Sequence, residues 1–152
     1  MHDLADRLLS ARRRGWLRSR PVFENSGLVS EDDLAALEQR VCCLLPPDLK
    51  AWLSLAGYGD IDQTFSIRNE WFQPVRNGEL KGGCRFAQDE LGNFYAFGPA
   101  HERLMFFSRS EPGYAVLAPS FQEFLTELER RNFKILEWVD SVKLSPYTWS
   151  AV

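Results

Sequence analysis

Two histidines and a pair of aspartates are the residues that would carry acid–base chemistry in this chain. His2 lies at the N-terminus, and His101 follows a Gly98-Pro99 turn. A hydrolase or nuclease needs a base, a nucleophile or metal ligands that converge on one point. Asp60 and Asp62 have the spacing of a metal-binding or acid–base pair, yet a turn rich in glycine and aspartate has the same letters. We interpret His101 as an exposed loop histidine and the aspartates as turn residues, with catalysis as the alternative.

The cysteines and glycines do not form a known catalytic pattern either. Cys42, Cys43 and Cys84 are an odd set with two adjacent members, so we expect reduced thiols, with a reactive thiol as the alternative. The sequence contains no HExxH motif, no CxxC pair and no phosphate-binding glycine loop. Gly82-Gly83 and Gly92 lie between strand-like segments and are interpreted as turns. We therefore predict no catalytic residue, no metal site and no cofactor, and a protein that is not an enzyme.

Acidic residues in turns and at strand ends are better suited to binding than to catalysis. Such acids can gather at one rim and attract a basic protein, with Trp71 or Tyr58 as an aromatic anchor. The candidate partner-binding residues are Asp60, Asp62, Glu70, Trp71, Glu79, Asp89 and Glu90. The alternative is a set of scattered acids that serve solubility alone.

Charge is distributed unevenly along the chain. Six arginines against two aspartates give residues 1–20 a net charge of +4. Because the whole chain has a net charge of −3, the remaining residues carry −7. An acidic body repels nucleic acid and attracts basic partners. The cluster Arg12-Arg13-Arg14 leaves a nucleic-acid binder as an alternative, but direct nucleic-acid binding is disfavoured by the acidic remainder.

No apolar run approaches the roughly 20 residues of a membrane helix. The N-terminal residues carry charge and lack an apolar block followed by a cleavage site, so no secretory signal is indicated. We expect a cytoplasmic protein that does not span a membrane.

Helices are predicted at the beginning of the chain. Leu4 and Leu8 have helical spacing ahead of Gly15, which indicates a short amphipathic helix with arginines on its outer side. Residues 21–27 contain proline, asparagine, serine and glycine, which are typical of a loop.

Two further helices have recognisable ends. Ser30 and Asp33 form a capping pattern that starts one helix. Pro46-Pro47 starts the next, and Gly57 is a natural stop for it. Residues 57–62 are then predicted to be a turn.

The middle of the chain changes to short runs rich in aromatic and β-branched residues. Their closeness indicates antiparallel pairing, because parallel neighbours need crossover connections of a dozen or more residues. The predicted strands are residues 64–67, 71–75, 83–88, 94–97, 104–108 and 114–118.

A last helix begins at Ser120, where a second capping pattern precedes an apolar stripe that includes Phe121. After Asn132 this helix continues or restarts. Trp52 and Phe121 belong to apolar helical stripes and are predicted to be core residues.

The predicted fold class is α+β, with a largely antiparallel or mixed twisted sheet of about six strands flanked by N-terminal helices and a C-terminal helix. The length suits one domain over residues 1–152. Within it we distinguish a basic N-terminal helix and loop (1–27), a core (28–140) and a tail (141–152).

Three stretches in this order resemble the SUKH superfamily, which unites a yeast cell-wall synthesis regulator with many bacterial immunity proteins. Residues 45–53 (LPPDLKAWL) resemble the family's leucine–proline start of a helix. Residues 86–97 (FAQDELGNFYAF) are similar to its central strand, glycine turn and strand, and residues 118–125 (APSFQEFL) to the entry of its last helix. The turn at residues 56–60 departs from the usual Asn-Gly-Gly, and residues 1–20 lie outside the well-matched region.

The resemblance implies a non-catalytic protein-binding domain. Bacterial members are commonly immunity proteins that neutralise a toxin domain, frequently a nuclease, so the expected partner is a protein such as a basic toxin. The alternative is a regulatory or scaffold protein of the yeast-regulator kind that binds cellular partners.

Overall fold

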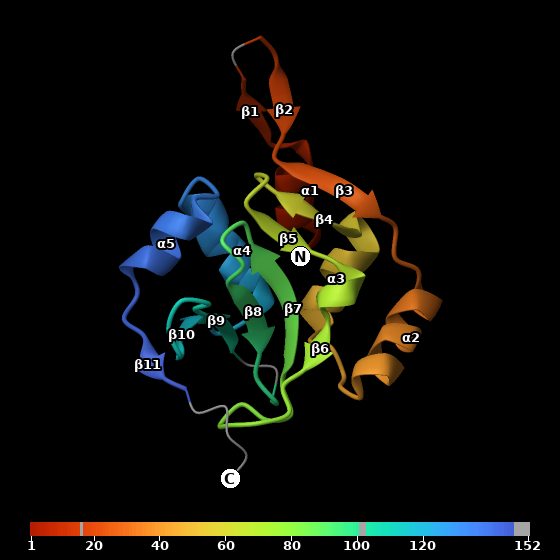
Figure 1. The fold of residues 1–152 in the computed structure, drawn as a ribbon. Helices are drawn as coiled ribbons and strands as arrows, with labels where there is room; N and C mark the ends of the chain where they lie inside the picture. Colours follow the sequence, from red (N-terminus) through yellow and green to blue (C-terminus); the bar gives the residue numbers. More distant parts are fainter. Residues whose placement is uncertain (16, 101–102, 148–152) are drawn as a thin grey trace.

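The computed structural model describes residues 1–15, 17–100 and 103–147 (Figure 1). In this part of the chain, helices and antiparallel strands pack into an α+β fold, as the sequence predicts. The main sheet is larger than predicted, with nine strands in place of about six. None of the described helices has the length and apolar character that a membrane span needs.

The nine strands of the main sheet pair only in the antiparallel sense. They are β3 (Phe23–Gly27), β4 (Tyr58–Ile61), β5 (Phe65–Ile67), β6 (Gln73–Pro74), β7 (Cys84–Asp89), β8 (Phe94–Phe97), β9 (Leu104–Phe107), β10 (Gly113–Ala118) and β11 (Ser145–Pro146). Their order is β11-β10-β9-β8-β7-β5-β4-β3, with β6 on a separate branch beside β7. The two edges are therefore β3 and β11, the first and last strands of this sheet in chain order.

Five α-helices pack against one face of this sheet, which we call the inner face. They are α1 (His2–Ser10), α2 (Glu31–Val41), α3 (Pro47–Ala56), α4 (Phe121–Arg130) and α5 (Ile135–Ser141); a short 3-10 helix, η1 (Asn69–Trp71), precedes β6. The predicted starts are confirmed at Ser30, whose side chain forms a capping box with Asp33, and at Ser120, which accepts the Glu123 N–H. The last helix restarts, because Asn132 and Phe133 have positive φ and break it.

Aromatic rings fill the larger core between the helices and the inner face. Trp52 of α3 is completely buried, and its ring meets Phe23 at 5.2 Å and Phe121 at 6.4 Å between centroids. Phe121 in turn contacts Phe86 of β7 at 5.8 Å. The edge-to-face geometry of these pairs adds to their burial, so α3, α4, β3 and β7 are joined through one set of rings. Both predicted core residues are confirmed.

A smaller core lies on the opposite, outer face of the sheet and covers only part of it. Its buried members are Val75, Leu80, Ala96, Met105, Phe107 and Tyr147. The Tyr147 hydroxyl donates to the Asn77 carbonyl at 2.7 Å and accepts from the Leu80 N–H at 3.3 Å. The β6–β7 loop and the C-terminal segment therefore cover β8, β9 and β10, whereas the buried residues of all five α-helices belong to the inner core.

Two segments predicted to be irregular are strands, and the reason is a tertiary contact. Residues 21–27 were predicted to be a loop and contain β3; residues 57–62 were predicted to be a turn and contain β4. A Cβ at Gly59 would lie 2.3 Å from the Glu24 carbonyl oxygen and 2.6 Å from the Phe23 ring. Glycine in β4 thus permits the close approach of β3. From composition alone, the same glycine indicates a turn.

The arginine cluster is also strand and not helix. Helix α1 ends at Ser10, and residues 12–21 form a hairpin of β1 (Arg12–Arg14) and β2 (Ser19–Pro21) that projects from the body (Figure 1). We call this hairpin the arm. Alternation along a strand turns Arg13 away from Arg12 and Arg14, a separation that a helix would not give. A further correction is Trp71, predicted to begin a strand, which ends η1.

Replacing Trp52 by alanine should lower the free energy of unfolding by about 3–5 kcal/mol, because a fully buried aromatic side chain is removed from the ring cluster. Urea denaturation followed by circular dichroism measures this loss. The control is Leu44→Ala, since Leu44 is exposed and should change stability by less than about 0.5 kcal/mol. A loss below about 1 kcal/mol for Trp52→Ala would contradict the core described here.

Candidate protein-binding face

One row of side chains crosses the outer face of the sheet in register. Each member lies opposite the next on the neighbouring strand, and the row runs through Glu24, Asp60, Ser66, Gln88, Phe94, Phe107 and Tyr114. Its composition changes between β7 and β8, from polar to aromatic. The outer face thus has a polar half on β3, β4, β5 and β7 and an aromatic half on β8, β9 and β10.

The aromatic half is closed. Phe94 stacks on Phe107 at 5.0 Å, and the Tyr147 ring meets Phe107 edge-on at 5.2 Å. Arg85 of β7 lies over the Phe94 ring at 4.4 Å, and burial lowers its pKa. This cation–π contact marks the border between the two halves.

The polar half is open to solvent. Its four row members are partly exposed, and no described helix buries residues against them. Arg68 pairs with Asp60 at 2.9 Å and also lies over the Trp71 ring at 5.6 Å. Both members of the ion pair keep about a third of their side-chain surface exposed, so solvent screens the pair and its charges remain accessible to a partner.

A hollow borders this polar half, between α2 and η1. It has a volume of about 350 Å³, and its lining includes Leu28, Arg40, Tyr58 and Asn69. Leu28 is 88% exposed, an unusual position for a leucine. Arg40 donates to the carbonyls of Asn69 (2.6 Å) and Phe72 (3.1 Å) and so holds α2 against η1. The hollow offers apolar and aromatic surface beside charged groups, which is the composition of a protein-binding hot spot.

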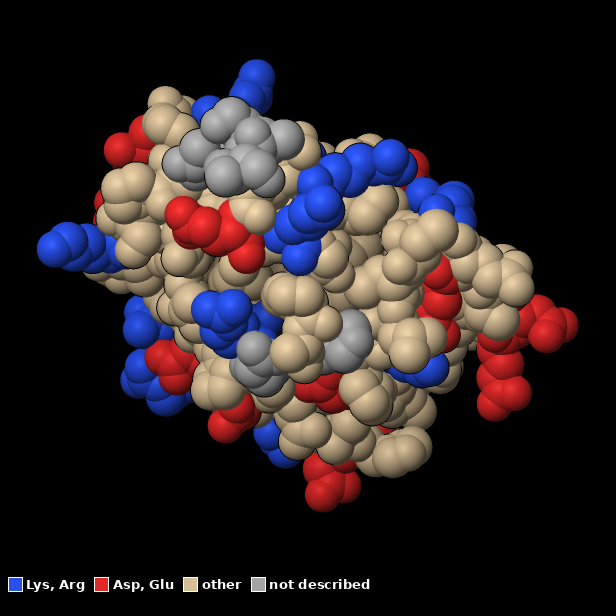
Figure 2. Space-filling view, turned by 90° about the horizontal axis from the view of Figure 1, so that it is seen from below, with Lys and Arg blue, Asp and Glu red and all other residues tan. Residues whose placement is uncertain are grey.

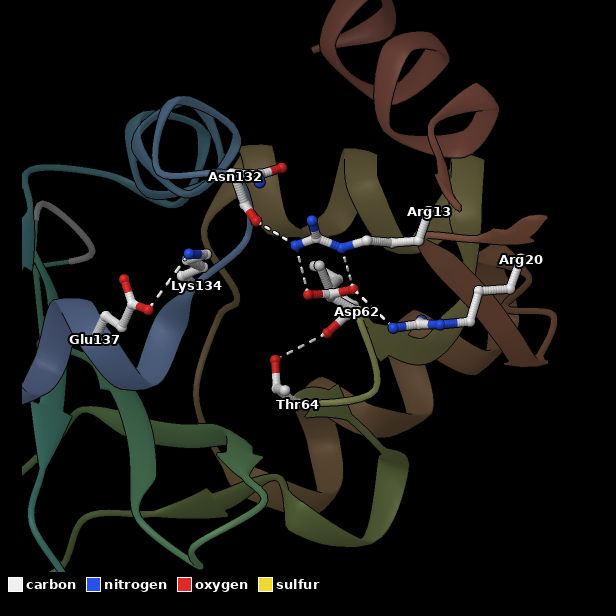
Figure 3. A network of polar contacts seen from close by, with 8 residues as sticks. Arg13, Arg20, Asp62, Thr64, Asn132, Lys134 and Glu137 are labelled. Atoms are coloured by element: carbon white, nitrogen blue, oxygen red, sulfur yellow. Dashed lines mark hydrogen bonds and ion pairs between the residues drawn. The ribbon is translucent and has the colours of Figure 1, made fainter. Parts of the chain in front are cut away.

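The acid Asp62 is engaged inside the molecule (Figure 3). Its carboxylate accepts two hydrogen bonds of 2.8 Å from Arg13 and one of 3.2 Å from Arg20. The bond to Asp62 raises the pKa of Arg13, and the same guanidinium donates to the Asn132 carbonyl. A bidentate arginine–carboxylate pair is directional, so Asp62 holds the arm against the β4–β5 turn and the α4–α5 turn.

Asp89 is likewise not a surface acid. It is 6% exposed, and its carboxylate accepts from the Leu91 N–H, from Asn93 and from the Tyr95 hydroxyl at 2.8 Å. Burial is the main reason that the pKa of Tyr95 is raised. Asp89 therefore shapes the β7–β8 turn. The next residue, Glu90, is exposed, and its N–H donates to the Thr64 carbonyl at 2.9 Å.

The structure brings together only some of the candidate residues. Asp60 and Trp71 contact Arg68 at the polar half, Glu70 lies in η1 next to Trp71, and Glu90 lies at the β7–β8 turn. Glu79 is in the β6–β7 loop, at the other end of the sheet (Figure 1). Figure 2 shows that end from below, where basic and acidic side chains are interleaved and neither charge forms a large patch of its own.

Sequence reasoning missed the residues that complete the face. Glu24 and Gln88 belong to it through strand pairing, Arg68 through its ion pair with Asp60, and Leu28 through the hollow beside α2. The only local signal was the alternation of Tyr58 and Asp60 around Gly59, which a strand produces. Pairing partners far apart in sequence leave no local pattern.

The residue types suited to acid–base, metal or thiol chemistry are not assembled in the described part of the chain. No group of three metal-ligating side chains occurs among the described residues, and His2 is exposed. His101 lies outside the described residues. Cys42 is exposed, Cys43 is partly buried, and burial raises the pKa of the Cys84 thiol to about 12. Cys84 is thus protonated at neutral pH, the unreactive form of a thiol.

Comparison with known proteins gives one family. Residues 28–127, which are 100 of the 152 residues, match the SMI1 / KNR4 family (SUKH-1). No protein with a curated description and no solved structure matches the chain. The matched segment begins after β3 and ends within α4, so α1, the arm, β3 and α5 lie outside it.

Replacing Asp62 by alanine should speed tryptic cleavage within the arm, because Arg13 and Arg20 lose the carboxylate that holds them. Limited proteolysis with mass spectrometry of the fragments measures the rate. Asp60→Ala is the matched control, since it removes the Arg68 pair and leaves the arm untouched. Equal cleavage rates in both variants and the original protein would show that Asp62 does not restrain the arm.

Proposed function

Because the chain belongs to the SMI1 / KNR4 family (SUKH-1), we propose that it is a non-catalytic protein-binding domain, an immunity protein that binds and neutralises a toxin domain. The observation that carries this proposal is the open polar half of the outer face. Four strands there present partly exposed polar side chains, and no described helix covers them. Neighbouring strands lie about 4.8 Å apart, so the four strands together form a surface wide enough for the core of a protein interface.

The charges on this face favour a basic partner. Glu24, Asp60, Glu70 and Glu90 are set against Arg68 and Arg85, and residues 21–152 carry a net charge of −7. A nuclease must attract phosphate and therefore exposes a basic surface. An acidic face that covers such a surface speeds the encounter through electrostatic steering and blocks the substrate's approach.

The hollow beside the face would supply the short-range part of the binding. Leu28 and Tyr58 line this hollow, and Trp71, held by Arg68, ends the η1 helix that contributes Asn69 to the same lining. Aromatic residues and arginines at the centre of an interface account for most of the binding energy in protein complexes. The acids would thus speed the association of the partner, and the aromatic groups would slow its dissociation.

The proposal includes one domain over residues 1–152 and a cytoplasmic location. Support for one domain comes from the inner core, which combines Leu8 of α1 and Trp138 of α5 with residues of the family-matched segment. A regulatory protein that binds cellular partners, as in the yeast regulator of the superfamily, is the second candidate. The same face would serve it, so the identity of the partner separates the two.

Co-expression with the toxin domain encoded beside this gene should restore cell growth, and Glu70→Lys combined with Glu90→Lys should weaken the rescue. Reversing two exposed acids opposes a basic surface, so the association rate of the purified proteins should fall about tenfold at low salt. Glu79→Lys with Glu137→Lys is the matched control on other surfaces. A neighbouring toxin that the chain neither binds nor neutralises would overturn the proposal and favour the regulatory role.

Replacing Trp71 by alanine should act on dissociation. A half-buried anchor at an interface raises the dissociation rate when it is truncated, and we expect an increase of about 30-fold. Surface plasmon resonance measures this rate, and a thermal melt of the free protein serves as the control. A fall in melting temperature with an unchanged dissociation rate would make Trp71 a packing residue.

A further inference from the structure

The arm, residues 12–21, is the most basic segment of the chain. It contains five arginines and no acidic residue. Its two strands pair in register, with Arg13 opposite Arg20 and Arg12 opposite Pro21. The arm extends away from the helices and the sheet (Figure 1), so most of its surface faces solvent.

The five arginines fall into two sets. Arg13 and Arg20 point to the body and share the carboxylate of Asp62 (Figure 3). The other set is Arg12, Arg14 and Arg18, all exposed; Arg12 donates hydrogen bonds to the hydroxyl and the carbonyl of Ser19. Within the described part of the chain, no carboxylate pairs with this second set.

Like charges held side by side on a hairpin destabilise it. One acid of the body, Asp62, pairs with the inward arginines of the arm. Among the described residues, no acid of the body pairs with the outward arginines. Leu17, close to the tip, is 85% exposed among these charges. Among its described residues, the arm therefore presents outward three arginines without a carboxylate partner and the apolar side chain of Leu17. This combination is complementary to an acidic protein surface that includes an apolar residue.

The arm is also restrained before any partner binds. The Val22 N–H donates to the Ala11 carbonyl at 2.9 Å, and the Asp62 N–H donates to the Val22 carbonyl at 2.7 Å. Helix α1, which leads into the arm, packs against α3 and α4 with Leu4 and Leu8 buried. A restrained arm loses less conformational entropy on binding than a free tail of the same sequence.

Nucleic acid fits this surface less well than protein does. A polyanion that reaches beyond the arm meets a body with a net charge of −7, which repels it. A short acidic segment of a protein ends within the reach of the three arginines, and its apolar residue can cover Leu17.

We propose that the arm is a second binding element, which grips an acidic segment of a partner protein with Arg12, Arg14, Arg18 and Leu17. The inference does not depend on the toxin role, because it rests on the charges of the arm alone. The arm precedes the family-matched residues 28–127. The arm therefore adds a basic binding surface to the domain that the family shares, whereas the polar half is acidic.

Fluorescence anisotropy with the full chain tests this proposal. The probes are a short labelled peptide of glutamate and leucine, an all-glutamate peptide of equal charge, and a labelled DNA duplex. The chain should bind the mixed peptide best at an ionic strength of about 0.01 M, where screening is weak and charges still attract one another over about 30 Å. Arg14→Glu with Arg18→Glu should weaken that binding at least about fivefold.

Two further variants make the outcome specific. Leu17→Ser should weaken binding of the mixed peptide and leave the all-glutamate peptide unchanged. Arg76→Glu with Lys81→Glu is the control, since both residues are exposed and lie in the β6–β7 loop. Peptide binding that is absent, or that falls equally in the control, would overturn the proposal. Tighter, arm-dependent binding of the DNA duplex would make the arm a nucleic-acid contact instead.

Discussion

The buried residues of the five described α-helices all join one core on the same face of an antiparallel sheet, and the remainder of the molecule follows from this constraint. The rings of Trp52, Phe121 and Phe86 hold the helices and the sheet together on the inner face. Because a pleated sheet sends alternate side chains to opposite faces, burying one set of residues commits the other set to the outer face. The outer face then has to be covered by something else or remain open. Here the C-terminal segment and the β6–β7 loop cover only its aromatic half.

The segment ahead of the family-matched region is part of this construction. Strand β3 supplies Phe23 to the ring cluster and Glu24 to the polar row, so the same five residues serve both faces. Its approach to β4 requires glycine at position 59. Asp62, at the end of β4, then accepts the two inward arginines of the arm. One edge of the sheet therefore carries a core contact, a polar face and the anchor of a projecting hairpin.

This arrangement gives the proposed interface two signs of charge. The polar half is acidic with one arginine, Arg68, paired to Asp60, and the arm is basic with a leucine close to its tip. A partner that engages both would need a basic patch next to an acidic one. Such a pattern discriminates among related partners more strongly than a surface of one sign, because a wrong partner brings like charges together. In an immunity protein, which has to recognise its own toxin, this discrimination would be as useful as affinity.

The sequence by itself determined the class of the fold and most of the helix starts. Capping residues and apolar stripes act within one or two turns, so Ser30, Ser120, Trp52 and Phe121 could be assigned without a structure. The family resemblance was also carried by local motifs, and the match over residues 28–127 confirms it.

Only the tertiary structure decided which acids are accessible. Asp62, Asp89 and Glu90 all lie at the end of a strand or in a turn, yet Asp62 binds two arginines more than forty residues away and Asp89 is buried under a turn. The strands β3 and β4 depend in the same way on each other, since each is too polar or too glycine-rich to be predicted alone. Pairing across a sheet and ion pairs between distant segments are long-range interactions. They leave no periodicity in the chain, and for that reason the fold could be predicted better than the binding face.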